Sequence, residues 1–291
     1  MNESESGTRL NKYLASCGIG SRRACDELIQ KGGVVVNGKV CTNLSQKVTE
    51  EDFVKIENKR VFPKDTTTVL FNKPRGCVCT KNDELGRDTI YEYLPPTLRH
   101  LNHVGRLDQD SEGLIVLTND GDISQTLTHP KLKVEKEYLV TVNQSFDNSI
   151  LDQFLKGIFI GKGMPRAKAK AVKRLSPRRF LVTLETGLKR QIRLMCKALH
   201  LNVVKLVRVR IGMVVGAGLE SGRWTELDAD DIKMLQTNPK QSQRIPGQRT
   251  VATTKKFASK KTAKKTGRRS APNTRGNAKP NSSKSYKRKR S

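Results

Sequence analysis

One stretch of the sequence, GRLDQDSEGLIVLTND at residues 105–120, concentrates carboxylates in a chain that is otherwise strongly basic. The whole chain of 291 residues has 56 Lys and Arg, 28 Asp and Glu, and a formal net charge of +28. The apolar run GLIVLT predicts a buried strand, so the residues before it form the loop that leads into that strand. Asp110 fits the start of a turn, and Asp120 fits a tight turn after the strand. Asp108 is the carboxylate with the least obvious structural task.

A loop carboxylate beside a core strand can act as a nucleophile or accept a proton. The same arrangement is more often a local salt bridge or a turn cap, so composition alone favours a structural interpretation of Asp108. Two further side chains have the same ambiguity. Tyr138, in the strand-like run EKEYLVTV, is by itself most simply a core aromatic. Arg193, in KRQIRLMC, is most simply part of a solvated helix face with Arg190.

The elements before this region predict a small α+β unit. Residues 8–17 have the apolar spacing of a short helix, and Ser21 can cap a second helix that Gly32 and Gly33 end. The run VVVNGKV predicts a hairpin with an Asn-Gly turn. Arg22 and Arg23 fall in the first turn of the second helix, where cations oppose the helix dipole. A solvated charged turn is one explanation, and phosphate binding is the better one.

The rest of the body is mostly strands with a few helices. TVLFN, GLIVLT, EYLVTV, RFLVTLE and VVKLVRVRI are β-rich runs, whereas residues 189–200 have helical periodicity, and Asp228 can cap a last helix. Residues 56–68 lack periodicity and contain a proline, which indicates a linker. We therefore expect an α+β fold with a mixed or antiparallel sheet and flanking helices.

The cysteines and the chain start limit the class of protein. Six cysteines are scattered without a CxxC pair and without nearby histidines, which indicates buried thiols rather than a zinc site. No stretch approaches the roughly 20 apolar residues that span a membrane, and the acidic start MNESESGTRL does not resemble a signal peptide. We therefore expect a cytoplasmic protein without membrane association.

The last segment differs in composition from the body. Residues 240–291 contain 18 Lys or Arg and no Asp or Glu, with few aliphatic residues and many Ser, Thr, Asn, Gly and Pro. Such a segment cannot bury enough apolar surface to offset its ordering entropy, so we expect it to be disordered. A solubility tail and polyanion capture by counterion release are both consistent with it, and the unbroken single-sign charge favours capture.

Three runs in the first unit, RLNKYLA, SRRACDELI and GGVVVNGKV, resemble the S4 RNA-binding domain of the αL type. This resemblance implies that one RNA-facing surface carries Lys12, Arg22, Arg23 and Asn37. The resulting expected organisation is an S4 domain at 7–55, a linker at 56–67, a catalytic domain at 68–239 and a disordered basic tail at 240–291.

Four runs in the second domain resemble motifs of the type A pseudouridine synthases of small-subunit ribosomal RNA and of their large-subunit relatives. They are NKPRGCVCT, GRLDQDSEGL, EKEYLVTV and GLKRQIRLMC, in the order of that family. The resemblance implies that Asp108 is the indispensable carboxylate, that Arg193 pairs with it, and that Tyr138 stacks on the target uracil. Relatives commonly carry a second arginine where this chain has Leu194, which bears on a phosphate contact near the site.

The implied reaction moves the ribose C1′ bond of uridine from N1 to C5, without net redox change or nucleotide hydrolysis. No cofactor and no metal are therefore expected. Whether Asp108 attacks C1′ or removes a ribose proton stays open. We expect further RNA contacts around the site from Lys73, Arg106, Lys136, Arg190 and Gln191.

Within the family the pattern is most similar to the type F synthases of large-subunit ribosomal RNA, with type B next. That similarity implies a uridine of 23S ribosomal RNA near the peptidyl-transferase centre and, in some members, a transfer-RNA anticodon uridine. We expect a monomer. A small-subunit or tRNA-specific synthase, or a non-catalytic ribosome-assembly factor that binds RNA, remain the alternatives.

Overall fold

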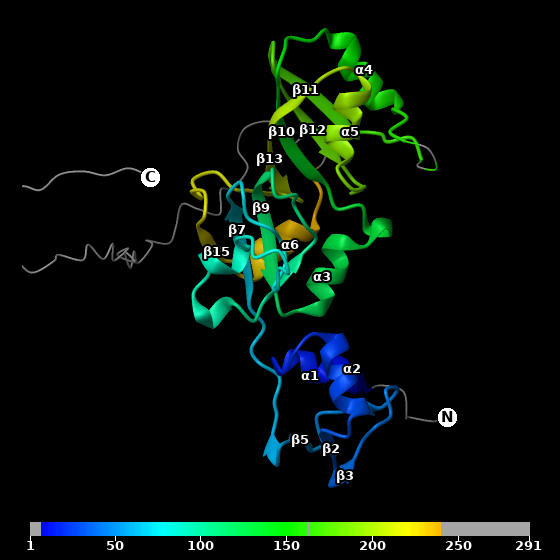
Figure 1. Ribbon diagram of the computed structural model, residues 1–291, viewed down its shortest axis with the longest axis vertical. Coiled ribbons are helices and arrows are strands. Elements are labelled where there is room, and N and C mark those ends of the chain that lie inside the picture. Colours follow the sequence, from blue (N-terminus) through cyan, green and yellow to red (C-terminus); the bar gives the residue numbers. More distant parts are fainter. Residues whose placement is uncertain (1–6, 162, 164, 240–291) are drawn as a thin grey trace, which may run out of the picture. The chain divides into compact units, whose positions relative to one another are not determined.

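The N-terminal domain packs two helices against a small antiparallel sheet (Figure 1). The computed structural model describes residues 7–161, 163 and 165–239. The strands β3-β2-β5-β6 form one sheet in that order, and β1 pairs with β4. The elements of this domain are β1 (Thr8–Arg9), α1 (Leu10–Ser16), α2 (Arg22–Gln30), β2 (Val34–Val36), β3 (Lys39–Val40), β4 (Lys47–Val48), β5 (Val54–Ile56) and β6 (Lys59–Arg60).

Local chemistry accounts for the predicted elements of this domain. The Ser21 side chain accepts a hydrogen bond from the Ala24 amide and caps α2, which places Arg22 and Arg23 in its first turn as expected. Asn37 and Gly38 both have positive φ, 50° and 81°, which the right-handed twist of a two-residue hairpin favours. The α1–α2 unit and the β2–β3 hairpin are therefore confirmed.

The linker begins later than the sequence predicted. Glu57 and Asn58 turn the chain at φ values of 48° and 63°, and β6 then returns along β5. Val61 packs against the core of the domain, and its carbonyl accepts a hydrogen bond from the Tyr13 hydroxyl. The expected start of the linker at residue 56 is thus wrong, because Glu-Asn is a weaker hairpin signal than Asn-Gly and only the pairing with β5 reveals it.

The second domain is built on a nine-stranded sheet that runs β11-β12-β10-β13-β9-β7-β15, with β14 paired to β13 and β8 to β9. All pairings are antiparallel except β9 with β13, where Glu112 lies opposite Val207. The mixed sheet predicted from the sequence is therefore confirmed. The strands are β7 (Thr68–Lys73), β8 (Asn102–Val104), β9 (Glu112–Thr118), β10 (Lys136–Val142), β11 (Ala171–Ser176), β12 (Arg179–Leu184), β13 (Val203–Ile211), β14 (Val214–Val215) and β15 (Trp224–Glu226).

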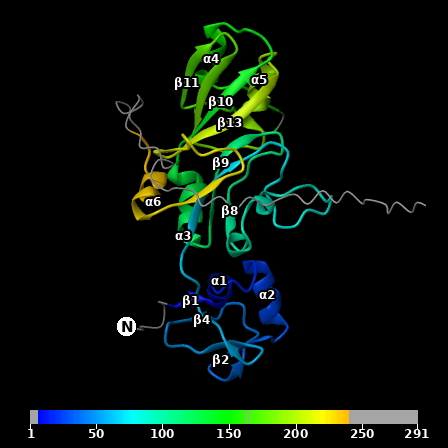
Figure 2. The same cartoon turned by 90° about the vertical axis from the view of Figure 1, so that its left-hand side faces the viewer.

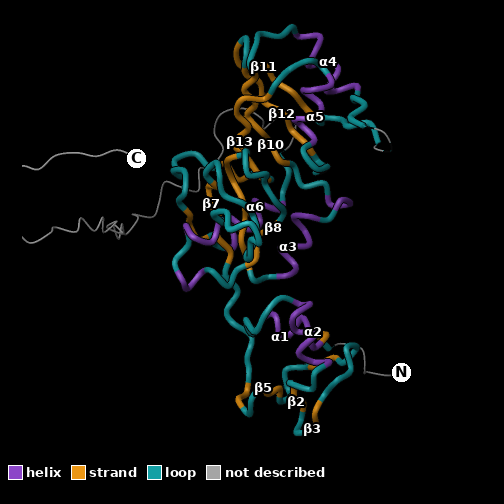
Figure 3. Tube along the Cα trace, in the orientation of Figure 1, coloured by secondary structure: helices purple, strands orange, loops and turns teal. Residues whose placement is uncertain are grey.

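Among the described residues of this domain, four α-helices flank the sheet. Figure 2 shows them from the side, two near β10 and β11 and two near β8 and β9. The helices are α3 (Gly121–Thr128), α4 (Asn148–Lys156), α5 (Gln191–Ala198) and α6 (Ala229–Gln236). The predicted α5 and the Asp228 cap of α6 are confirmed. The expected tight turn at Asp120 is instead the N-cap of α3, since its side chain accepts from the Asp122 and Ile123 amides. Three short 3-10 turns, Ile90–Tyr93, Pro96–Leu98 and Pro130–Leu132, lie in the connections (Figure 3).

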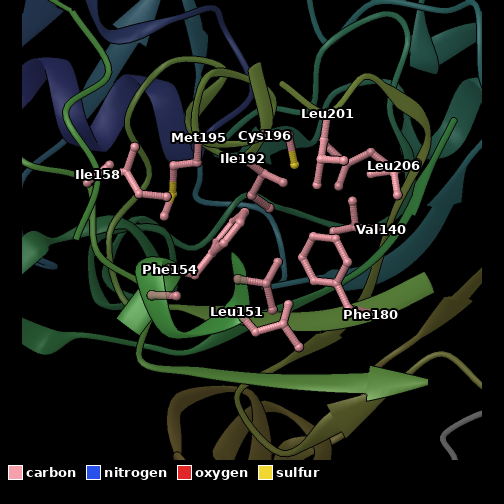
Figure 4. Packing of buried hydrophobic residues seen from close by; sticks show 14 of the residues in the cluster. Val140, Leu151, Phe154, Ile158, Phe180, Ile192, Met195, Cys196, Leu201 and Leu206 are labelled. Atoms are coloured by element: carbon pink, nitrogen blue, oxygen red, sulfur yellow. The ribbon is translucent and has the colours of Figure 1, made fainter. Parts of the chain in front are cut away.

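Three hydrophobic clusters hold the second domain together. One packs α4 and α5 on β10 and β12 through side chains such as Phe154, Phe180 and Met195 (Figure 4). A second covers one face of β7 and β9 with the long connection that follows β7, and a third covers their other face with α3 and α6. Since both of its faces are covered, β9 reads as a continuous apolar run. The cysteines are buried except Cys41, which is half-buried.

Candidate active site

The loop between β8 and β9, residues 105–111 and here named the aspartate loop, is held by the NKPRGCVCT segment. The buried Lys73 ammonium donates to the Ser111 carbonyl at 2.8 Å. The Cys79 thiol donates to the Leu107 carbonyl at 3.4 Å. The Gly76 amide donates to the Gln109 carbonyl at 2.8 Å, and the Gln109 side chain donates back to the Gly76 carbonyl at 2.9 Å. These bonds fix the backbone on both sides of Asp108.

The two carboxylates of this loop differ in their partners. Asp110 lies 3.2 Å from Arg190 Nη2 and 3.3 Å from Arg193 Nε, so two guanidinium groups hold it. Asp108 makes one ion pair among the described residues, a long contact of 3.7 Å with Arg190 Nη1. Each carboxylate side chain is 34% exposed. Asp108 is therefore accessible and weakly engaged, whereas Asp110 is part of the scaffold.

Among the described residues, the ion pair of Arg193 is with Asp110 and not with Asp108. Arg193 projects from α5, and its side chain is only 12% exposed. Its Nη2 donates to the Asp110 carbonyl at 2.9 Å and to Ser111 Oγ at 3.3 Å, while its Nη1 donates to the Val203 carbonyl at 3.3 Å. Burial lowers the pKa of Arg193, and the Asp110 carboxylate opposes this shift. Arg193 thus ties the end of the aspartate loop to α5 and β13.

Arg190 faces the carboxylates from the N-terminus of α5. It has a left-handed backbone, with φ 54° and ψ 28°, and its side chain is 44% exposed. An open cleft of about 330 Å³ is lined by Arg75, Gly76, Gln109, Asp110 and Arg190. The cleft therefore has cations at its rim beside the aspartate loop, which suits a phosphate of a bound nucleic acid.

Tyr138 lies on β10, where it is half-buried and packs against two of the three clusters. It pairs across the sheet with Arg208 of β13, next to the register shift between Glu137 and Tyr138. Lys136, two residues earlier, donates to the Leu127 carbonyl at 2.8 Å. Burial lowers the pKa of Lys136 to about 8, and the nearby Arg208 adds to the effect. Lys136 is thus used internally, which weakens its predicted role in RNA binding.

Several predicted RNA contacts are exposed and several are not. Lys12, Arg22, Arg23 and Arg106 are exposed. Asn37 is exposed too, but its side chain donates to Asp52 and accepts from the Phe53 amide, so it secures a turn.

Two predicted RNA contacts are wrong because their side chains are buried. Lys73 is fully buried and holds the aspartate loop. Gln191 is 3% exposed, and its carbonyl oxygen accepts from the Leu188 amide at 3.1 Å. Both side chains satisfy backbone groups that a sequence pattern does not show. The sequence analysis did not predict that Asp110 anchors the aspartate loop or that Arg75 lines the cleft. The signal for Asp110 was the presence of two loop aspartates and two helix arginines in the motifs, which allows more than one ion pair.

No group of three or more His, Cys, Asp or Glu side chains that could hold a metal ion occurs in the part of the chain described above. Over the same residues, no helix has the length and apolar character needed to cross a membrane.

Comparison with known proteins identifies the family. The model for RNA pseudouridylate synthase matches residues 67–198, and that for the S4 domain matches residues 8–54. A Shigella flexneri protein named dual-specificity RNA pseudouridine synthase RluF is 40% identical over 235 residues, which cover 78% of each chain. The chain belongs to the RNA pseudouridine synthases.

Other relatives of this pseudouridine synthase agree. The Bacillus subtilis protein named ribosomal large subunit pseudouridine synthase B is 35% identical over 232 residues, covering 78% of this chain and 95% of that protein. A solved structure titled as a pseudouridylate synthase is 31% identical, with a TM-score of 0.59, over 78% of this chain and 99% of that chain. The enzyme is thus an isomerase that acts on RNA, and the resemblance inferred from its motifs is confirmed.

Proposed function

We propose that this pseudouridine synthase converts a uridine of large-subunit ribosomal RNA to pseudouridine, with Asp108 as its catalytic carboxylate. The names of the relatives support the substrate, since they include a large-subunit synthase and a dual-specificity enzyme. The observation that carries the assignment of Asp108 is the contrast between the two carboxylates. Asp110 is bound by two arginines, whereas Asp108 has one contact of 3.7 Å and remains available to a substrate.

The reaction requires little beyond this carboxylate and a base held in place. The C1′–N1 bond of the uridine breaks, the uracil turns, and a C1′–C5 bond forms. The proton on C5 leaves to solvent or to a nearby base, and N1 takes up a proton, so the composition of the nucleotide is unchanged. Asp108 acts either on C1′ as a nucleophile or on a ribose proton as a base. An enzyme that reaches a base in structured RNA has to unstack it, and an aromatic face compensates for the lost stacking. Tyr138, at the junction of two hydrophobic clusters, supplies that face.

The two arginines of the site have different tasks in this proposal. Arg193 is a positioning residue, because it binds the backbone and side chain of Asp110 and does not contact Asp108. Arg190 is half-exposed, lies near both carboxylates and lines the cleft with Arg75. It is therefore placed to exchange its carboxylate contacts for an RNA phosphate when the substrate enters.

RNA capture is assigned to the S4 domain and to the basic tail. Arg22 and Arg23 lie in the first turn of α2, a nine-residue helix whose N-terminal amides also favour a phosphate. The tail at 240–291 lies outside the described residues, and its composition alone supports a role in polyanion binding. We extend the proposal to a monomeric enzyme of the cytoplasm that also modifies a transfer-RNA anticodon uridine. The word dual-specificity in the name of the relative supports a second substrate.

Purified enzyme and protein-free large-subunit RNA labelled with tritium at uracil C5 test this proposal. We expect tritium release by the wild type, none by Asp108→Asn, and an RNA affinity for Asp108→Asn that is unchanged or slightly higher, because a carboxylate opposes polyanion binding. Small-subunit RNA and transfer RNA serve as competing substrates. Release only from small-subunit RNA would overturn the substrate, and release by Asp108→Asn would remove Asp108 from the chemistry.

A further inference from the structure

The N-terminal domain exposes two phenylalanines that its core does not use. Phe53 precedes β5 and is 52% exposed, and Phe62 follows β6 and is 59% exposed. The guanidinium of Arg60 lies over both rings, 4.0 Å from the centroid of the Phe53 ring and 4.7 Å from that of the Phe62 ring. Single exposed apolar residues are ordinary, but an ordered stack of two rings around a cation is not.

The strand register places this stack on one face of the sheet. Val54 and Ile56 of β5 point into the core, so Phe53 and Lys55 lie on the opposite side. Arg60 is the partner of Lys55 across the β5–β6 hairpin, and Phe62 lies two residues further on. This outer face of the sheet is defined by the strand positions Val35, Val40, Lys55 and Arg60, which alternate with the core, together with Phe53 and Phe62, which flank β5 and β6.

The backbone beneath the stack is firmly held. The Phe53 amide donates to Asn37 Oδ1 at 2.8 Å, and the Phe53 carbonyl accepts from the Asn37 amide at 2.9 Å. Asn37 also donates to Asp52, whose pKa is lowered by its hydrogen bonds from the Thr49 amide and from Asn37. The Asn37 side chain therefore holds the backbone of Phe53 in place.

The chemistry of this outer face fits an unpaired nucleobase. Its strand positions carry two cations, Lys55 and Arg60, and no carboxylate. Aromatic rings on an open sheet stack on bases of single-stranded RNA, and neighbouring cations bind the phosphates. We infer that the Phe53–Arg60–Phe62 stack is a second RNA site of this enzyme, which binds an unpaired base of the substrate on the outer face of a phenylalanine. This inference rests on the proposed function, which supplies a structured RNA with single-stranded segments.

The test compares the affinity of full-length variants for a fluorescent oligouridylate and for a chain of the same length that lacks bases. We expect Phe53→Ala/Phe62→Ala to bind oligouridylate about tenfold more weakly than the wild type, which is the usual scale for one stacked base. This variant and the wild type should bind the base-free chain with equal affinity. The slope of affinity against salt concentration should also be the same for the two proteins, because no cation is removed. Phe53→Trp/Phe62→Trp should bind oligouridylate at least as tightly as the wild type.

The control is Leu85→Ala, which removes a side chain that is 75% exposed in the second domain and has no ring or cation stacked on it among the described contacts. Phe53→Leu/Phe62→Leu keeps the apolar bulk without the aromatic face and takes the place of the alanine variant if that variant does not fold. Leu85→Ala should bind oligouridylate like the wild type. An alanine or leucine variant of the stack that binds oligouridylate as tightly as the wild type would overturn the inference, as would an equal loss of affinity for the base-free chain. The latter result would favour a general effect on the domain or a protein-docking role.

Tritium release from saturating RNA separates this inference from the proposed function. A wild type that modifies large-subunit RNA while the stack variants bind oligouridylate normally would remove the second site alone. A wild type without synthase activity on that RNA would remove the proposed function, whatever the stack variants show in the binding assay.

Discussion

Gly113 gives a quantitative test of how the aspartate loop joins the sheet. It lies five residues after Asp108, at the start of β9, and pairs with Arg208 in the parallel β9–β13 contact. Its φ is +106°, and a Cβ at this position would lie 2.5 Å from the Arg208 amide nitrogen and closer still to the Arg208 carbonyl oxygen. Backbone atoms on a neighbouring strand cannot rotate away as a flexible side chain would. Gly113→Ala therefore has to push β9 and β13 apart.

Two costs add in Gly113→Ala. The positive φ costs an alanine about 1 kcal/mol, and overpacking against a fixed neighbour typically costs a further 1–3 kcal/mol or more. We expect a loss of about 3 kcal/mol in the free energy of unfolding, measured by urea denaturation. A second effect should accompany it, since displacement of β9 moves Asp108 and lowers the single-turnover rate at saturating RNA.

Gly105→Ala is the matched control for Gly113→Ala. Gly105 also has a positive φ, +70°, but a Cβ there would meet no heavy atom within 4 Å. It should therefore lose only about 1 kcal/mol. If Gly113→Ala were no less stable than Gly105→Ala, the close parallel pairing of β9 with β13 would be refuted.

Three further outcomes follow from other parts of the molecule. Lys73→Met keeps the length of the buried side chain but removes the ammonium that donates to the Ser111 and Pro74 carbonyls. It should lower the rate of tritium release at least tenfold at unchanged RNA affinity, and an unaltered rate would remove Lys73 as a support of the aspartate loop. Burial lowers the pKa of His103 to about 4, and the nearby Lys81 and Arg106 add to the shift. Between pH 6.5 and pH 4 the unfolded chain therefore binds more protons at this residue than the folded chain does. The free energy of unfolding should fall as the pH drops through this window, by at most about 3 kcal/mol. Urea denaturation of His103→Gln should show a shallower acid dependence than the wild type, and identical curves would contradict this. Deletion of 240–291 should flatten the salt dependence of RNA binding, which for single strands is roughly 0.7 log units per phosphate neutralised, whereas an unchanged slope in a binding titration would leave the tail without a role in capture.

The elements that the sequence predicted well are those specified by local chemistry. The Ser21 cap, the Asn37-Gly38 turn and the Asp228 cap each depend on backbone groups within a few residues. The helix α3 was missed because its eight residues bury only Ile123 and Leu127, too little for a visible period. Its stability comes instead from packing on a cluster whose other members lie far away in the chain.

The sequence identified the residues of the candidate site but not the ion pairs that they form. The motifs located Asp108, Arg190 and Arg193, yet their pattern did not show that Arg193 pairs with Asp110 and Arg190 with both carboxylates. The same limit explains Lys73, a cation that the sequence presents as available and that the fold buries against backbone carbonyls. Such pairings depend on contacts between distant segments, which neither periodicity nor composition encodes.

A map of pseudouridine in total RNA tests the central claim most directly. It compares a strain that lacks this gene with the same strain carrying the wild type or Asp108→Asn. We predict that one large-subunit ribosomal uridine loses its modification in the deletion strain and regains it with the wild type and not with Asp108→Asn. A deletion strain with every pseudouridine in place, or a site restored by Asp108→Asn, would contradict the account.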